Sequence, residues 1–141
     1  MTNNTEIRTA TDTWAQAMRN DDLQGIIKHY AADIVAYDAV KQLQFVGIDA
    51  YRKHWDYCLK ACPGAMTFEI KDLVTHAENE TAFSFFLCRC GGTDESGEEK
   101  SSWMRVTRGL RKIDGAWLTV HEHFSSPFDM ESGMALFDLQ P

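Results

Sequence analysis

Residues 102–125 read SWMRVTRGLRKIDGAWLTVHEHFS, and this stretch decides the fold class. Its side chains alternate between apolar and polar, which is the two-residue period of a strand with one covered face. Asp114-Gly115 interrupts the alternation and is a strong signal for a two-residue hairpin turn. The stretch therefore predicts two antiparallel strands, at 101–112 and 117–125.

The same alternation continues upstream over residues 66–77 and 81–90. Before residue 66, apolar residues recur at helical spacing over 7–18, over 23–30, and in a helix that Gly47 opens and Pro63-Gly64 ends. A brief strand is expected at 34–39. Helices followed by a meandering sheet are typical of α+β proteins. We expect three N-terminal helices on one face of a curved antiparallel sheet, with a cavity between the two layers.

The composition is that of one globular domain covering residues 1–141. The chain carries 14 basic and 21 acidic side chains, so its net charge is −7. Nucleic-acid-binding domains usually present a basic face, so no nucleic-acid partner is expected. No apolar run approaches the roughly 18 residues of a membrane-spanning helix, so no membrane partner is expected. The N-terminal residues lack the basic and apolar features of an export signal, which predicts a cytoplasmic protein.

The cysteines and paired histidines give little sign of a metal. Cys58 and Cys62 are four residues apart in a helical segment, and Cys88-x-Cys90 alternates in a strand. Neither pair has zinc-site spacing, so structural thiols are the favoured interpretation. His121-x-His123 lacks a third ligand at recognisable spacing, and a polar outer face or a subunit contact competes with a metal site. No metal and no cofactor are predicted.

Three charged residues fall in the more apolar rows of their strands: Arg89, Arg108 and Glu122. An ionised group that faces a core is costly unless it is paired or hydrogen-bonded. One interpretation is a structural ion pair between Arg108 and Glu122, or strand ends open to water. The favoured interpretation is the polar floor of a ligand cavity, with arginine facing an anion or a developing oxyanion. A β-bulge would shift any of these rows by one residue.

Aromatic residues are expected in the core and on the surface. Those in the helical part are core residues first and cavity walls second: Trp14, Tyr30, Tyr51 and Trp55. The outward-facing row of the last two predicted strands contains Trp103, Trp117, His121 and His123. This row leaves apolar area uncovered, which predicts a homodimer.

Three groups of residues carry a family resemblance. They are Trp14-Ala-Gln-Ala-Met with Asp22-Leu23-x-Gly25, then Tyr30-Ala-Ala-Asp33, and Arg111-Lys-Ile-Asp-Gly115-x-Trp117 with His121-x-His123-x-Ser125-x-Pro127. Over nearly the whole chain the sequence resembles the nuclear transport factor 2-like superfamily, a cone-shaped α+β fold. That superfamily includes ketosteroid isomerases, SnoaL-like polyketide cyclases and the association (hub) domain of calmodulin-dependent protein kinase. The fold hosts many activities.

The resemblance to ketosteroid isomerases implies a site. From Tyr30 to Gly47 the spacing is similar without a gap, and Asp38 falls on that family's general base. The oxyanion-hole positions of that family are matched here by Trp14 and Arg108, so the base position is kept and the donors differ. An exposed carboxylate just after a short strand is the alternative interpretation of Asp38.

The resemblance to the kinase hub domain implies an anion-binding cavity. That domain binds small carboxylates with several arginines, and Arg89 and Arg108 look like matches for two of them. Phe124 stands where a third arginine would be. The resemblance is to this module and not to a kinase.

Three functions remain open. In the first, Asp38 abstracts a proton next to a carbonyl, Arg108 stabilises the oxyanion, and Glu122 and Arg89 set orientation and charge, as in an isomerase, cyclase or dehydratase. The second is a non-catalytic domain that binds a small carboxylate. The third is a dimeric assembly module whose cavity is incidental. The enzyme is favoured slightly, with a small anionic or carbonyl-containing molecule as its partner and Trp14, Tyr30, Tyr51, Trp55, Arg89 and Phe124 as ligand-binding residues.

Overall fold

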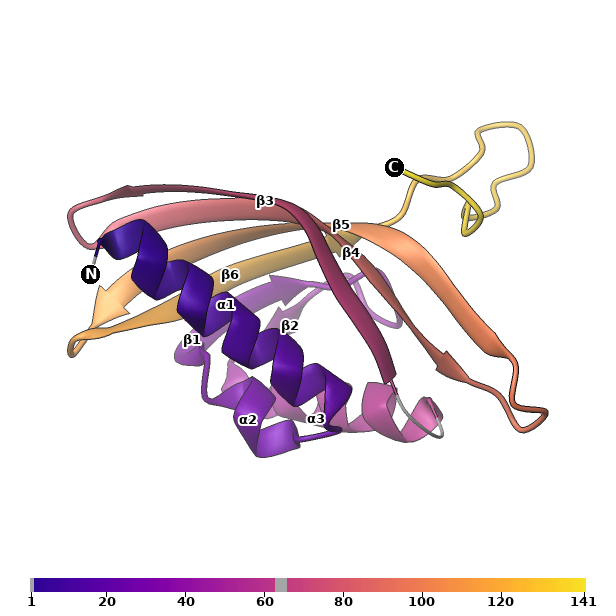
Figure 1. Cartoon of the computed structure of the whole chain (residues 1–141), viewed down its shortest axis with the longest axis horizontal. Helices are drawn as coiled ribbons and strands as arrows, with labels where there is room; N and C mark the ends of the chain where they lie inside the picture. Colours follow the sequence, from indigo (N-terminus) through magenta and orange to yellow (C-terminus); the bar gives the residue numbers. More distant parts are fainter. Residues whose placement is uncertain (1, 63–65) are drawn as a thin grey trace.

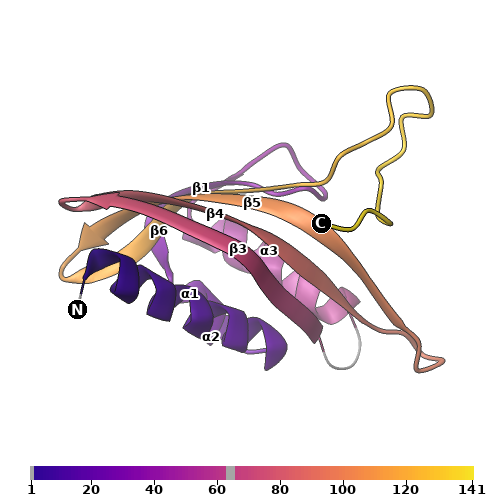
Figure 2. The same cartoon turned by 45° about the horizontal axis from the view of Figure 1, so that its top comes forward.

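In the computed structural model, which describes residues 2–62 and 66–141, three helices lie against one face of a curved sheet (Figures 1 and 2). The helices are α1 (Asn3–Arg19), α2 (Leu23–Ile27) and α3 (Ile48–Ala61). The strands are β1 (Tyr30–Tyr37), β2 (Phe45–Val46), β3 (Met66–Glu78), β4 (Thr81–Thr93), β5 (Glu99–Ile113) and β6 (Ala116–Ser125). The α+β class, the three N-terminal helices and the four long strands are confirmed. The expected helix end at Pro63-Gly64 lies outside the described residues.

The six strands form one unclosed sheet in the order β2-β1-β6-β5-β4-β3. The pairs from β3 to β6 are antiparallel, as predicted. β1 lies parallel to β6, however, so the expectation of a wholly antiparallel sheet is wrong. This pairing joins strands that are far apart in the sequence, and local alternation carries no information about it. No helix in the described parts of the chain is long and apolar enough to cross a membrane.

Side-chain caps and one close approach fix the helical layer. The Thr2 hydroxyl accepts a hydrogen bond from the Thr5 N–H, and the Asp22 carboxylate accepts one from the Gly25 N–H. A Cβ on Gly25 would lie 2.9 Å from the Ala17 Cβ and closer still to the Asp22 carboxylate. Gly25 therefore allows α2 to pack directly on α1.

The second helix is shorter than predicted. α2 ends at Ile27, and Tyr30 begins β1, where it is paired with Thr119 of β6. Strand pairing has overridden the helical spacing of the apolar residues. Tyr30 is consequently held on the sheet with its side chain buried.

The faces of β4 are the reverse of those predicted. Ser84, Phe86 and Cys88 are buried on the inner face, whereas Phe83 and Phe85 are exposed on the outer face. Both rows contain large apolar side chains, so alternation alone could not decide which one faces the helices. The consequence for the predicted site is that Arg89 belongs to the outer face.

A β-bulge also divides the faces of β6. Gly109 of β5 is paired with His121 and Leu110 with Thr119, so Val120 is the extra residue. Trp117 and Thr119 are therefore buried, on the same side as Glu122 and Phe124. The assignment of Trp117 to an exposed row with the histidines is wrong, which removes part of the argument for a dimer. The dimer remains a prediction.

Candidate active site

A network of buried polar side chains lies beneath the helices, centred on Glu122 of β6. Its Oε1 accepts a hydrogen bond from Arg108 Nε at 2.9 Å, within an ion pair. Its Oε2 accepts hydrogen bonds from the hydroxyls of Tyr30 at 2.8 Å and Tyr51 at 2.6 Å. The Glu122 side chain is 0% exposed and that of Arg108 is 3% exposed. Of the alternatives for these two charges, a structural ion pair is the arrangement observed.

The network keeps both tyrosines neutral. Burial raises the pKa of Tyr30 and of Tyr51 well above the usual value, and the negative charge of Glu122 raises each further. Both hydroxyls therefore remain hydrogen-bond donors to the carboxylate. Since each donor comes from a different element, Glu122 ties β1, α3 and β5 together.

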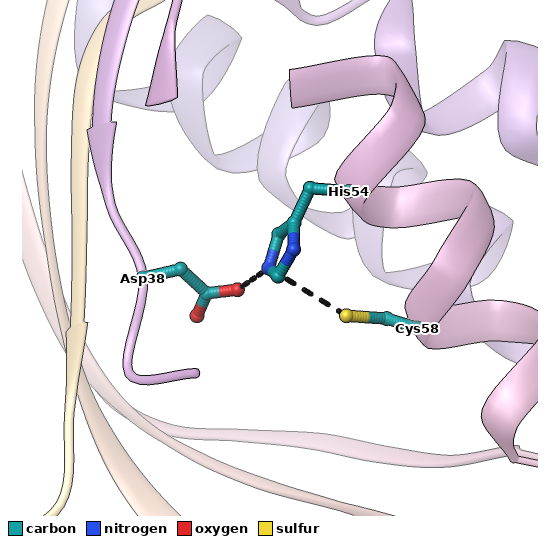
Figure 3. Close-up of side chains that lie close together, drawn as sticks. All are labelled: Asp38, His54 and Cys58. Atoms are coloured by element: carbon teal, nitrogen blue, oxygen red, sulfur yellow. Dashed lines mark hydrogen bonds and ion pairs between the residues drawn. The ribbon is translucent and has the colours of Figure 1, made fainter. Parts of the chain in front are cut away.

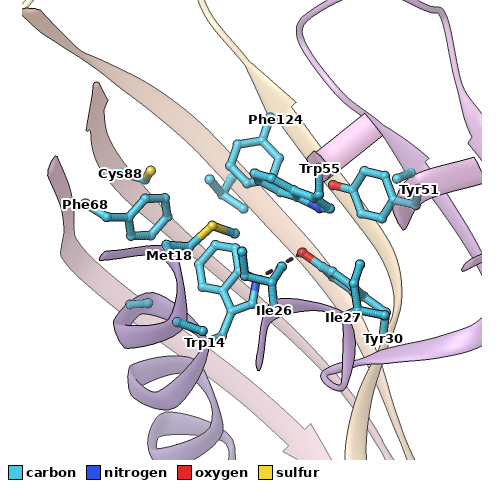
Figure 4. Close-up of a cluster of buried hydrophobic side chains, with 14 of the residues drawn as sticks. Trp14, Met18, Ile26, Ile27, Tyr30, Tyr51, Trp55, Phe68, Cys88 and Phe124 are labelled. Atoms are coloured by element: carbon cyan, nitrogen blue, oxygen red, sulfur yellow. Dashed lines mark hydrogen bonds between the residues drawn. The ribbon is translucent and has the colours of Figure 1, made fainter. Parts of the chain in front are cut away.

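Aromatic side chains fill the inner face around this network (Figure 4). The Arg108 guanidinium lies 3.8 Å from the centre of the Trp14 ring, and Trp14 Nε1 donates to the Tyr30 hydroxyl at 3.0 Å. Trp55 packs edge-on against Phe124. All five predicted aromatic site residues are thus buried in the core, and they occupy space that the sequence assigned to a cavity.

Two donors at this inner face lack an acceptor. Arg108 Nη2 and Trp55 Nε1 are buried, and neither has a hydrogen-bond partner among the described residues. A buried donor without an acceptor costs free energy. A hydrogen-bond acceptor placed next to either atom would therefore be stabilising.

Arg89 is not part of this network. It lies on the outer face and forms ion pairs with Glu69 at 3.0 Å and Glu99 at 2.8 Å. The prediction that Arg89 and Arg108 face one cavity side by side is therefore wrong, because the two arginines lie on opposite faces of the sheet.

A second polar group lies where β1 ends (Figure 3). The Asp38 carboxylate, through Oδ2, forms a short contact with His54 Nε2 from α3, and its Oδ1 accepts the Ala39 N–H at 2.7 Å. The Cys58 Sγ lies 3.6 Å from the same His54 nitrogen. The side chains of Asp38 and His54 are 9% and 2% exposed. The interpretation of Asp38 as an exposed carboxylate is therefore wrong.

Tyr51 and Phe45 connect the two polar groups. Tyr51 is one turn before His54 on α3, the two rings are stacked 6.1 Å apart, and the Tyr51 hydroxyl reaches Glu122. Phe45 of β2 stacks on His54 at 4.1 Å. These contacts hold the imidazole in one orientation against Asp38.

Two surface hollows flank the Asp38–His54 pair. One, of about 580 Å³, is lined by Asp38, the rest of the loop over residues 37–44, and His123. The other, of about 270 Å³, is lined by His54, Lys41 and Lys53, together with Gln42, Phe45, Ala50 and Tyr57. Neither hollow is lined by Arg108 or Glu122. The three predicted catalytic residues are thus divided, with Asp38 at the hollows and the other two in the core.

His54 was missed in the sequence, although a signal for it was present. The apolar stripe of the third helix was read from Tyr51, Trp55 and Leu59, and His54 lies beside it with Cys58 one turn later. A histidine next to an apolar stripe is a candidate for a partnered, buried side chain. Its partner Asp38 is 16 residues earlier, and only the fold brings the two together.

His29, near the Arg108 network, gives a pH-dependence to test. Burial, together with the positive charges of Arg108 and Lys28, lowers the pKa of His29 from 6.5 to about 4. Between those pH values the unfolded chain binds a proton that the folded chain does not, so this group lowers stability on acidification. We expect the free energy of unfolding, measured in urea, to fall less from pH 6.5 to pH 4 in His29→Gln than in the wild type. Equal decreases in both proteins would contradict this assignment.

Burial also makes Cys58 a poor nucleophile. It raises the pKa of the Cys58 thiol from 9.0 to about 12, and the charge of Asp38 acts in the same direction. The arrangement differs from that of a nucleophilic triad, because Asp38 and Cys58 both contact Nε2 of His54 rather than opposite ring nitrogens. Among these three residues, proton transfer is therefore the chemistry of Asp38 and His54.

Comparisons with known proteins agree with this fold. The model of the SnoaL-like domain matches residues 7–129. A crystal structure of an NTF2-like protein of unknown function from Pseudomonas putida KT2440 is 46% identical, with a TM-score of 0.90 over 100% of this chain and 99% of that one. A search of curated proteins gave no match.

More distant solved structures share the fold alone. One is a putative calcium/calmodulin-dependent protein kinase II association domain from Xanthomonas campestris, with 19% identity and a TM-score of 0.76 over 95% of this chain and 88% of that one. Another is a putative dehydratase from the NTF2-like family of Streptomyces avermitilis, with 14% identity and a TM-score of 0.75 over 86% of this chain and 93% of that one.

Proposed function

This chain belongs to the SnoaL-like family of the nuclear transport factor 2-like superfamily, and we propose that it is a small-molecule enzyme that abstracts a proton next to a carbonyl. The observation that carries the proposal is the Asp38–His54 pair, which is nearly buried yet borders two hollows. A carboxylate and an imidazole in contact are the groups from which general acid–base sites are most often built.

In the proposed reaction, the Asp38–His54 pair accepts the proton as the C–H bond breaks. The bonding electrons move onto the carbonyl oxygen and give an enolate. Lys41, which lines both hollows, supplies the positive charge for that oxygen. Return of the proton to another carbon gives an isomer. Transfer of that proton to a β-hydroxyl, which leaves as water while the enolate electrons form the carbon–carbon double bond, gives a dehydrated product.

The Arg108–Glu122 ion pair has a supporting role in this proposal. Arg108 donates to Glu122, Glu122 accepts the Tyr51 hydroxyl, and Tyr51 stacks on His54. They are therefore positioning residues for α3, in place of the oxyanion contact first expected for Arg108.

Hydrogen–deuterium exchange tests the proposed reaction without knowledge of the natural substrate. A panel of small ketones, keto acids and β-hydroxy carbonyl compounds is incubated with the protein in D2O, and exchange next to the carbonyl is followed by NMR. We expect at least one compound to exchange faster than in buffer alone. Binding of panel compounds with no acceleration of any of them would contradict an enzyme and favour the second candidate.

That second candidate is a non-catalytic receptor for a small carboxylate. The favouring observation is the hollow of about 270 Å³, which gathers Lys41, Lys53 and His54 beside the Phe45 and Tyr57 rings. The two lysines can form charge-assisted hydrogen bonds with a carboxylate, while the aromatic rings pack against the planar part of the ligand. The sequence predicted an anion site at Arg89 and Arg108, and we now propose it at Lys41 and Lys53.

Lys53→Met tests this anion site. We expect small aromatic or keto carboxylates to raise the melting temperature of the wild type, because a ligand that binds only the folded state stabilises it. Lys53→Met removes a charge from the hollow and should reduce the shift strongly. Lys60→Met removes a charge from the same helix, where Lys60 is exposed and paired with Asp56, and should leave the shift intact. Equal shifts in the two variants would place the anion elsewhere.

A further inference from the structure

The three side chains at the end of β1 converge in a way that proton transfer does not require. One potential metal-ligand atom from each of Asp38, His54 and Cys58 lies within 4.8 Å of the other two. The carboxylate and the thiol both face one atom, His54 Nε2 (Figure 3). In a hydrogen-bonded relay the two ring nitrogens serve different partners. Three ligand atoms gathered this closely can surround a common ion.

The separation of the His54 nitrogen and the Cys58 sulfur fits a tetrahedral metal. Zinc–nitrogen and zinc–sulfur distances of about 2.0–2.1 Å and about 2.3 Å give an N···S separation of about 3.5 Å at the tetrahedral angle. The observed separation of His54 Nε2 and Cys58 Sγ is 3.6 Å. These two ligands are four residues apart and lie on one face of α3. Asp38 would have to move away from His54, since a metal ion replaces their direct contact.

The chemistry of the three donors selects the kind of ion. Thiolate and imidazole ligands together favour zinc among the abundant divalent cations, whereas magnesium and calcium prefer oxygen ligands. The site is largely protected from solvent, because His54 is buried and Asp38 and Cys58 are only partly exposed. It borders the two hollows, so a fourth ligand can approach from solvent.

We propose that Asp38, His54 and Cys58 form a zinc-binding site with one open coordination position. On binding, the Cys58 thiol loses its proton to solvent and its sulfur bonds to the ion, since a coordinating thiol is deprotonated outright. The proton shared by Asp38 and His54 Nε2 in their hydrogen bond passes to solvent or to Nδ1, and this frees the Asp38 carboxylate and the Nε2 lone pair to supply the other two bonds. These are the lone pairs that accept a proton in the proposed reaction, so zinc inhibits that reaction and a chelator restores it.

Cobalt titration of the tag-free protein tests the site, because Co²⁺ takes the place of zinc and reports its ligands. We expect one equivalent of Co²⁺ to produce visible bands of tetrahedral cobalt and a sulfur-to-cobalt charge-transfer band, all lost on addition of Zn²⁺. Cys58→Ser should abolish the charge-transfer band. It should weaken zinc binding at least about 100-fold, since changes outside the ligands already cost about 10–100-fold.

Cys62→Ser is the matched control. Cys62 lies at the C-terminal end of the same helix and is outside the cluster, so this variant should keep the full spectrum. A wild-type titration without a charge-transfer band would overturn the proposal. A band that persists in Cys58→Ser would also overturn it and would point to another cysteine. The titration needs no substrate, so its result is independent of whether the chain is an enzyme.

Discussion

Replacing Arg108 with methionine is expected to lower the free energy of unfolding by about 3–5 kcal/mol, the usual cost of removing one partner of a buried ion pair. The substitution leaves the Glu122 carboxyl group at 0% exposure without its cation, with two tyrosine hydroxyls as its described hydrogen-bond partners. It also removes the cation that lies over the Trp14 ring. Urea denaturation followed by tryptophan fluorescence measures the change.

Arg89→Met is the matched control for this prediction. It is the same substitution on the neighbouring strand and it also breaks ion pairs, but its partners Glu69 and Glu99 are about half exposed. Exposed pairs contribute about 0–1 kcal/mol, so we expect a change in that range. If Arg108→Met costs no more than Arg89→Met, the buried pair does not stabilise the fold as argued.

Asp38→Asn and His54→Gln are each expected to lower the rate of carbonyl-adjacent proton exchange by about 10²–10⁴-fold, the usual contribution of a positioned acid–base group. Asparagine keeps the shape of Asp38 and can still accept the Ala39 N–H, but it cannot take up a proton. Because the two residues act as one unit, the double variant should be little slower than either single variant. Fully multiplicative effects would show that they act separately, and circular dichroism of each variant checks that it is folded.

Much of the sheet could be predicted because its strands are long and locally connected. The turn at Asp114-Gly115 has both residues at positive φ, as its sequence requires, and it fixes the pairing of β5 with β6. Arg108 and Glu122 are direct partners because Val120 is an extra residue; without that bulge the turn would pair Arg108 with His121, so alternation alone did not determine their contact.

The errors arose where local pattern is ambiguous. Phe83 and Phe85 are as apolar as the row that is buried, so the face of Arg89 could not be chosen from the sequence. The extra residue Val120 reversed the face of Trp117, and a bulge in a well-alternating strand leaves little trace in composition.

Of the three side chains in the candidate site, the sequence predicted Asp38 alone. Asp38 was found through a resemblance that depends on chain spacing alone. His54 and Cys58 belong to another element, and their meeting with Asp38 depends on how α3 packs beside β1. Long-range contacts of this kind require the tertiary structure.

The exchange rate of one responsive compound with three proteins shows whether Asp38 acts as the base. The proteins are the wild type, Asp38→Asn and Asp33→Asn, which carries the same change at an exposed position on β1. We expect the rate with Asp33→Asn to match the wild type, and the rate with Asp38→Asn to fall by at least about 100-fold with its fold intact. Equal rates in all three proteins would show that the Asp38–His54 pair is not the base.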